Sequence, residues 1–146
     1  MGHGDGTIIM CPKTADGNGG EISIFDLGTI VTYYQWWDVA KLLKNREIRY
    51  MFMSHADETH TSFFPKVFPI EEAETETYPD LSKLEAIYHT CPVEQYQYGL
   101  PVDNSVVEWL EYHSDKTVMI NDGEPCGTEK CIQNGGDLRT CTCLGF

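Results

Sequence analysis

Apolar residues recur along the chain in short runs with the spacing of strands or of helices. Residues 7–11 form one apolar run and residues 21–27 alternate apolar with polar positions, so we expect two strands there. Residues 12–20 between them are rich in Gly, Asp and Asn, which favours a turn and therefore a β-hairpin. Residues 36–43 carry apolar side chains at helical spacing, and Asn45 can end that helix.

The rest of the chain continues this alternation of strands with helices. Residues 48–54 are expected to be a buried strand, and shorter strands are expected at 84–89 and 117–120. A helix is expected over residues 103–114, beginning at a polar cap. Its buried face is expected to consist of Val106, Val107, Trp109 and Leu110.

Other stretches favour irregular structure. Residues 63–70 are apolar but contain two prolines, which is typical of a packed loop or a short helix, and residues 91–102 are expected to be a loop. Residues 71–80 hold five acidic residues and no basic one, which favours a solvated loop, with a weak calcium site as the alternative. The Gly- and Cys-rich C-terminus is expected to end in a strand through Thr142 and Leu144.

The order of these elements predicts the fold class. Strands that alternate with crossover helices form a mixed β-sheet with flanking helices, so we expect an α/β protein. With 146 residues, of which 41% are hydrophobic, the chain can build one proper core. We therefore expect a single domain over residues 1–146.

The charge and hydropathy exclude two classes of partner. The formal net charge is −13, and the basic residues form no cluster, so the surface repels a phosphate backbone and we expect no nucleic-acid binding. No segment is apolar over the length that a bilayer requires, so we expect no membrane insertion.

Six cysteines predict an oxidising compartment. Their spacing lacks the C-x-x-C pairs of zinc ribbons, and up to three disulfides in an extracellular, secreted protein are expected instead. No signal peptide is visible, so we expect Met1 to be an internal residue of a processed precursor. Cys126 with Cys131 is one candidate pair, and Cys11 with a C-terminal cysteine is another. The cysteines are Cys11, Cys91, Cys126, Cys131, Cys141 and Cys143.

The candidate chemistry follows the strand expected at 48–54. Two histidines and two carboxylates fall within six residues there, on a turn that can aim several side chains at one point. His55, Asp57 and His60 are the candidate metal ligands, and His89 at a strand end is a possible fourth. The competing interpretation is a vestigial loop whose polar groups hydrogen-bond one another.

Three segments together resemble the metallo-β-lactamase superfamily, in the branch found in bacterial DNA-uptake (competence) proteins. Residues 2–9 (Gly-His-Gly-Asp-Gly-Thr-Ile-Ile) are similar to its opening strand, and residues 24–28 (Ile-Phe-Asp-Leu-Gly) to its second strand. Residues 54–60 (Ser-His-Ala-Asp-Glu-Thr-His) lie where that branch keeps its His-x-Asp-x-Asp-His metal motif. The resemblance implies one αβ half of an αββα sandwich and a hydrolytic metal site.

Two departures from the family bear on function. Thr59 stands where the family's motif has its second aspartate, which weakens one metal position. The chain also matches only the first half of the family's fold, so ligands from the second half are missing. We therefore expect a domain that has lost catalysis and serves as a structural, assembly or binding module, covered on its exposed half by self-association or a second chain.

The alternative is a metal-dependent hydrolase, phosphodiesterase-like or nuclease-like, that uses His55, Asp57 and His60. In the first case we expect no cofactor, and in the second a single divalent metal, with zinc favoured. A third interpretation concerns the aromatic cluster of Tyr33, Tyr34, Trp36 and Trp37. These rings form either a binding platform, for example for a carbohydrate, or the buried start of a helix.

Overall fold

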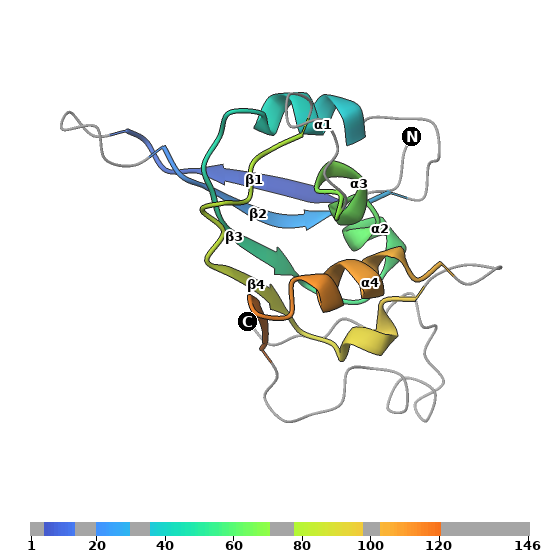
Figure 1. Ribbon diagram of the computed structural model, residues 1–146. Coiled ribbons are helices and arrows are strands. Elements are labelled where there is room, and N and C mark those ends of the chain that lie inside the picture. Colours follow the sequence, from blue (N-terminus) through green and yellow to red (C-terminus); the bar gives the residue numbers. More distant parts are fainter. Residues whose placement is uncertain (1–4, 14–19, 30–35, 71–77, 98–102, 121–146) are drawn as a thin grey trace.

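The computed structural model describes residues 5–13, 20–29, 36–70, 78–97 and 103–120 (Figure 1). The strands are β1 (Gly6–Met10), β2 (Ile22–Leu27), β3 (Ile48–Met53), β4 (Ala86–His89) and β5 (Thr117–Met119). The helices are α1 (Trp36–Leu43), α2 (Glu58–Thr61), α3 (Phe64–Val67), the 3-10 helix η1 (Val93–Gln95) and α4 (Ser105–Tyr112).

The strands form one mixed sheet in the order β1-β2-β3-β4-β5. The first two strands pair antiparallel, as expected for the hairpin, and the later pairs are parallel. The α/β class with a mixed sheet and flanking helices is therefore confirmed. Each parallel strand is added beside the one before it, so the carboxyl ends of β2, β3 and β4 meet at one edge of the sheet.

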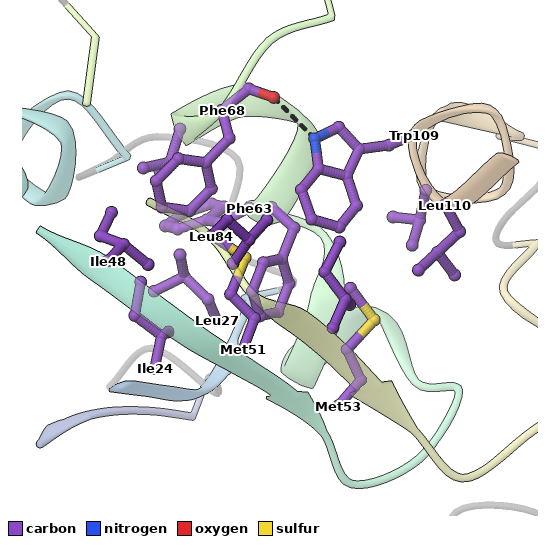
Figure 2. Close-up of a cluster of buried hydrophobic side chains, with 14 of the residues drawn as sticks. Ile24, Leu27, Ile48, Met51, Met53, Phe63, Phe68, Leu84, Trp109 and Leu110 are labelled. Atoms are coloured by element: carbon purple, nitrogen blue, oxygen red, sulfur yellow. Dashed lines mark hydrogen bonds between the residues drawn. The ribbon is translucent and has the colours of Figure 1, made fainter. Parts of the chain in front are cut away.

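One face of the sheet carries the hydrophobic core. Successive right-handed crossovers in the same direction place their helices on the same face. Inward side chains of the sheet, such as Ile24 and Met51, accordingly share one buried cluster with residues of α1, α3 and α4. Figure 2 shows this cluster between the strands and the two helices α3 and α4.

Trp109 of α4 anchors the centre of the core. Its side chain is fully buried, and its indole Nε1–H donates a hydrogen bond of 2.7 Å to the carbonyl oxygen of Phe68 (Figure 2). The rings of Trp109 and Phe64 lie 5.6 Å apart. Because a buried indole needs a partner for its N–H, this hydrogen bond fixes how α4 sits on the segment after α3.

The other face of the sheet, here the second face, has a different character. Residues paired between neighbouring strands form rows across this face. One row crosses all five strands, and the row beside it crosses four. None of these side chains belongs to the hydrophobic core cluster within the described residues. The second face consists of Thr7, Phe25, Phe52, Tyr88 and Val118 in the first row, and Ile9, Ser23, Tyr50 and Ala86 in the next.

The strands and the two long helices lie where the sequence predicts them. The apolar stretch 63–70 contains a short helix, which was one of its two expected forms. The prediction missed two short elements, α2 and η1. The strand expected near Thr142 and most of the acidic stretch 71–80 lie outside the described residues. Among the described helices, none is both long and apolar enough to cross a bilayer.

Candidate functional site

The candidate site lies at the edge where the parallel strands end. Residues 54–57 follow β3 as a loop, and α2 begins at Glu58. Asp26 comes from the neighbouring β2, and Thr90 follows β4. The Thr90 hydroxyl donates to the Ser54 carbonyl oxygen at 2.6 Å, which ties β4 to this loop. In open α/β sheets, ligands bind at this type of edge.

Asp26 lies at the centre of the site and accepts hydrogen bonds from two residues of the loop after β3 and α2. Its carboxylate accepts hydrogen bonds from the Ser54 backbone N–H at 2.8 Å and the Ser54 hydroxyl at 2.7 Å. It also accepts from Nδ1 of His60 at 2.9 Å. Asp26 is buried and has a φ of 52°, a left-handed conformation that Asp tolerates better than most residues. The sequence shows Asp26 only as part of the second resembling segment, so its role was not predicted.

His60 stands between two carboxylates. While Nδ1 faces Asp26, Nε2 lies 3.3 Å from Oδ2 of Asp5. The backbone of Asp5 is fixed as well, because its N–H donates to the Thr59 carbonyl oxygen and its carbonyl oxygen accepts from Gly28. The cluster therefore joins the start of β1, the end of β2 and the loop after β3.

His55 packs directly against His60. Their ring centroids are 3.9 Å apart, and Nδ1 of His55 lies 2.9 Å from the Ser54 hydroxyl oxygen. Since that hydroxyl donates its proton to Asp26, Nδ1 of His55 must donate to it, which leaves the lone pair on Nε2. Burial and the adjacent His60 lower the pKa of His55, against the opposing effect of nearby carboxylates. His55 is therefore a neutral imidazole at neutral pH.

Asp57 turns toward its own helix. It is the N-cap of α2, and its Oδ1 accepts from both the Thr59 backbone N–H at 2.8 Å and the Thr59 hydroxyl at 2.6 Å. Burial alone would raise the pKa of Asp57, but the two hydrogen bonds from Thr59 and the nearby imidazoles outweigh it and lower the pKa. The third predicted ligand is thus engaged by Thr59, the residue that departs from the family motif.

Gly28 allows α2 to approach β2 closely. A Cβ atom at this position would lie 2.5 Å from both the Glu58 carbonyl oxygen and the Thr61 amide nitrogen. Both are backbone atoms, which cannot move aside without shifting the helix. The Asp-x-Gly sequence therefore has two roles here: Asp26 bonds the histidine loop, and Gly28 makes room for it.

His89 is not part of the histidine pair. Its Nδ1 donates to the Cys91 carbonyl oxygen at 2.8 Å, and its ring meets that of Tyr96 edge-on at 6.2 Å. Burial lowers the pKa of His89, although the hydrogen bond to Cys91 acts the other way. Its position is thus that of a core histidine at the end of β4.

The metal-ligating groups do not all converge. In the part of the chain that the structure describes, no three or more His, Cys, Asp or Glu side chains are grouped as a metal site requires. His55 and His60 meet, with Asp26 and Asp5 at the second histidine. Asp57 and His89 have other hydrogen-bond partners.

The aromatic cluster is partly visible. Trp36 and Trp37 stack with centroids 4.0 Å apart, and Tyr78 joins them at 6.4 Å and 6.0 Å respectively. Trp36 packs against the core, whereas Trp37 is 45% exposed. The binding platform remains a prediction. Tyr33 and Tyr34 lie outside the described residues. Tyr78 was not predicted because it is 41 residues further along the chain than Trp37.

Two of the six cysteines lie in the described part of the chain. Cys11 is exposed and Cys91 is buried, and within the described residues no disulfide joins them. The other candidates, Cys126, Cys131, Cys141 and Cys143, lie outside the described residues.

Comparisons with known proteins leave the family open. No family model matches the chain, and neither a curated protein nor a solved structure matches it.

Proposed function

We propose that this chain is a secreted, disulfide-stapled domain resembling one half of a metallo-β-lactamase, and that it serves as an assembly or binding module without catalysis. The observation that carries the proposal is the pairing of Asp57 with Thr59. A hydrolytic metal site needs several converging ligands and an open coordination position. Here one expected carboxylate is missing and the other caps a helix.

The remaining polar groups support a structural role. Asp26 accepts three hydrogen bonds, from Ser54 and from His60, and Asp5 fixes the far side of His60. This network joins β1, β2 and the loop after β3. Around Asp26 it is buried, and there satisfied polar groups favour one conformation, whereas the Asp5 side chain is 69% exposed. The cluster then stabilises the fold by holding these segments together.

A metal-dependent hydrolase is the second candidate, and the contact between His60 and Asp5 favours it. If Nδ1 of His60 donates to Asp26, the Nε2 lone pair faces the Asp5 carboxylate unless a proton or a cation lies between them. Histidines that bind metals commonly donate their other N–H to a carboxylate, as His60 does to Asp26. His55, with its free Nε2, would be the second nitrogen ligand.

Metal dependence of stability separates the two candidates. For the structural module, natively purified protein contains no stoichiometric zinc, manganese or iron. EDTA then leaves the melting temperature unchanged, while His60→Ala lowers it by several degrees. For the hydrolase, elemental analysis gives about one metal per chain, EDTA lowers the melting temperature, and His55→Ala with His60→Ala removes the metal. His113→Ala, at the C-cap of α4 and away from the two histidines, is the matched control for metal content.

The disulfides and secretion are tested on the same sample. Three disulfides make the native mass about six hydrogens lower than that of the fully reduced chain. An unchanged mass on reduction would contradict the stapled, extracellular protein and would leave the assembly role to be judged by the metal experiment.

A further inference from the structure

We infer that the open edge of β1 is a docking site for the β1 strand of a second copy of this chain. The two strands pair antiparallel about a two-fold axis at Ile9, and the two sheets continue into one. The inference rests on the proposed assembly role, and it names both the partner and the register of the contact.

β1 is an outer strand of the sheet. The strand order places β2 on one side of β1, and among the described strands none pairs with its other side (Figure 1). Four of the five residues of β1 are exposed, and Ile9 and Met10 are each 51% exposed. The open side of an edge strand presents unpaired backbone N–H and C=O groups, which can pair with a further strand.

The hydrogen bonds of the hairpin show which backbone groups of β1 point outward. Cys11 donates its N–H to the Glu21 carbonyl oxygen at 2.9 Å, and its carbonyl oxygen accepts from the Gly20 N–H at 2.9 Å. Both groups of Cys11 thus point toward the neighbouring strand. Because this direction alternates along an antiparallel strand, the groups of Ile8 and Met10 point to the open side. Within the described residues, no hydrogen bond engages them there.

This edge lacks the features that usually prevent strand addition. Natural edge strands are commonly protected by charged side chains, by proline or by a bulge. The sequence of β1 contains neither a charged residue nor a proline. The irregularity in its pairing with β2 falls between Gly6 and Thr7, before Ile8. The stretch from Ile8 to Met10 is therefore a regular, uncharged edge.

Two flanking charges favour a second copy of β1 as the added strand. Asp5 precedes β1 and Lys13 follows it, at equal distances in sequence from Ile9. In an antiparallel pair centred on Ile9, each Asp5 lies opposite Lys13 of the partner subunit, and opposite charges across a strand pair are stabilising. The Asp5 side chain is 69% exposed, and Lys13 is exposed and has no acidic partner among the described residues.

The same register satisfies the outward backbone groups. Ile8 lies opposite Met10 of the partner subunit, and these two residues exchange both backbone hydrogen bonds. Pairs centred on Ile8 or on Met10 would also join outward groups, but they would not bring Asp5 opposite Lys13. The two charges therefore select the register centred on Ile9.

The contact is small, so we expect a reversible dimer. Pairing along one strand edge buries less than the roughly 800 Å² per partner of a standard interface, which is the range of weak and transient complexes. Backbone hydrogen bonds supply the affinity when a strand is added to a sheet edge. A Kd of about 100 µM is expected.

Disulfide trapping on the full chain tests the register. Ile9→Cys, combined with Cys11→Ser, places two Cα atoms about 4.5 Å apart across the two-fold axis, which a disulfide can span. Mild oxidation should convert this variant into a covalent dimer that reductant separates. Leu42→Cys in the same Cys11→Ser background is the matched control, because Leu42 is 60% exposed but lies on α1. It should stay monomeric, as should Cys11→Ser alone.

Sedimentation equilibrium tests the contact without a cross-link. Met10→Pro removes an N–H that points away from β2, an orientation in which an edge strand tolerates proline. Lys13→Glu replaces attraction to Asp5 of the partner subunit with repulsion. Each change should weaken the dimer by about 10-fold or more, while the melting temperature stays near that of the wild type.

Three results would overturn the inference. One is an Ile9→Cys variant that is not trapped, which would mean that another part of the chain or a different protein covers this edge. Another is a Leu42→Cys variant trapped as fast as Ile9→Cys, which would indicate random collision. The third is a dimer that Lys13→Glu leaves unchanged. Circular dichroism establishes that each variant is folded, and if Met10→Pro fails to fold, Lys13→Glu and the trapping decide.

The metal experiment separates this inference from the proposed function. A β1-paired dimer of metal-loaded, EDTA-sensitive protein would contradict the non-catalytic role and retain the docking edge. A monomer without metal would retain the non-catalytic role and remove the docking edge.

Discussion

The Nδ1 atom of His60 lies 2.9 Å from Oδ2 of Asp26, and this contact joins the loop after β3 to the end of β2. The same carboxylate binds the backbone and the hydroxyl of Ser54. One side chain thus fixes both ends of the histidine loop. Asp26 therefore determines the positions of the two clustered histidines.

Replacing Asp26 with alanine should destabilise the fold by about 2–4 kcal/mol. The change leaves the Ser54 N–H and the His60 ring without an acceptor, and it places alanine at a positive φ. Asp26→Asn should cost less, because Asn keeps one acceptor oxygen and tolerates the same backbone conformation. Urea unfolding measures both, with Asp38→Ala at an exposed position as the control. Equal effects of all three variants would contradict the central role of Asp26.

Gly28→Ala tests the close approach of α2 to β2. The new Cβ would meet two backbone atoms at 2.5 Å, so the helix must shift and the fold should lose several kcal/mol, about 2–4. Gly6→Ala is the matched control, since its Cβ would have its nearest neighbours at 3.4 Å. Thermal melting compares the two. A Gly28→Ala variant as stable as Gly6→Ala would show that α2 does not sit this close.

Asp57 should make stability depend on acidic pH. Its folded-state pKa lies below that of the unfolded chain, so its contribution is present above about pH 4 and is lost as the pH falls through the folded pKa. Asp57→Ala removes this dependence, and it also removes the cap of α2 at a cost of about 1 kcal/mol. Urea midpoints between pH 2 and pH 6 measure the effect. An unchanged slope in the variant would mean that Asp57 is not bound by Thr59.

His89 should act in a higher pH range. Burial lowers its pKa in the folded protein, so below about pH 6.5 the unfolded chain takes up a proton more readily than the folded one. Stability is therefore lost as the pH falls below that value. His89→Gln should reduce the slope of the profile between pH 5 and pH 7 on the same urea assay, while Asp57→Ala should not. The rest of the slope comes from His55 and His113, whose pKa values are also lowered by burial. If both variants keep the wild-type profile in this range, another group titrates there.

The fold was predictable because its signals are local. The alternating run at 21–27, the helical spacing at 36–43 and the strand at 48–54 each specify an element through burial on one face. The short helices α2 and η1 were missed because four or three residues carry no periodicity. Asp57 was instead expected to face a metal. Without α2 predicted, the sequence does not show that its carboxylate accepts from the backbone N–H and the hydroxyl of Thr59.

The site was predictable only in part, because its geometry depends on distant segments. His55 and His60 are close in sequence and do meet, but their partners Asp26 and Asp5 come from other strands. A strand-end histidine such as His89 resembles a ligand in sequence, whereas its orientation is set by Cys91 and Tyr96. Spacing in sequence identifies the residue types, and the packing of the sheet decides which of them converge.

Thr59→Asp tests whether the loop still has the geometry of the family's metal motif. The Thr59 hydroxyl lies 2.6 Å from Oδ1 of Asp57, so an aspartate here brings two carboxylates together. Without metal this should destabilise the fold by about 1–2 kcal/mol, through like-charge repulsion and the lost hydrogen bond. Zinc should relieve the repulsion, so its stabilising effect on the melting temperature should be larger than in the wild type.

Thr59→Val is the control for this experiment, because it removes the hydroxyl without adding a charge. It should be destabilised to a similar extent, but it should not respond to zinc. Differential scanning fluorimetry with and without zinc, followed by calorimetric titration, measures both variants. If Thr59→Asp and Thr59→Val respond to zinc alike, the loop no longer directs position 59 toward the histidine pair, and the metal motif cannot be restored by one residue.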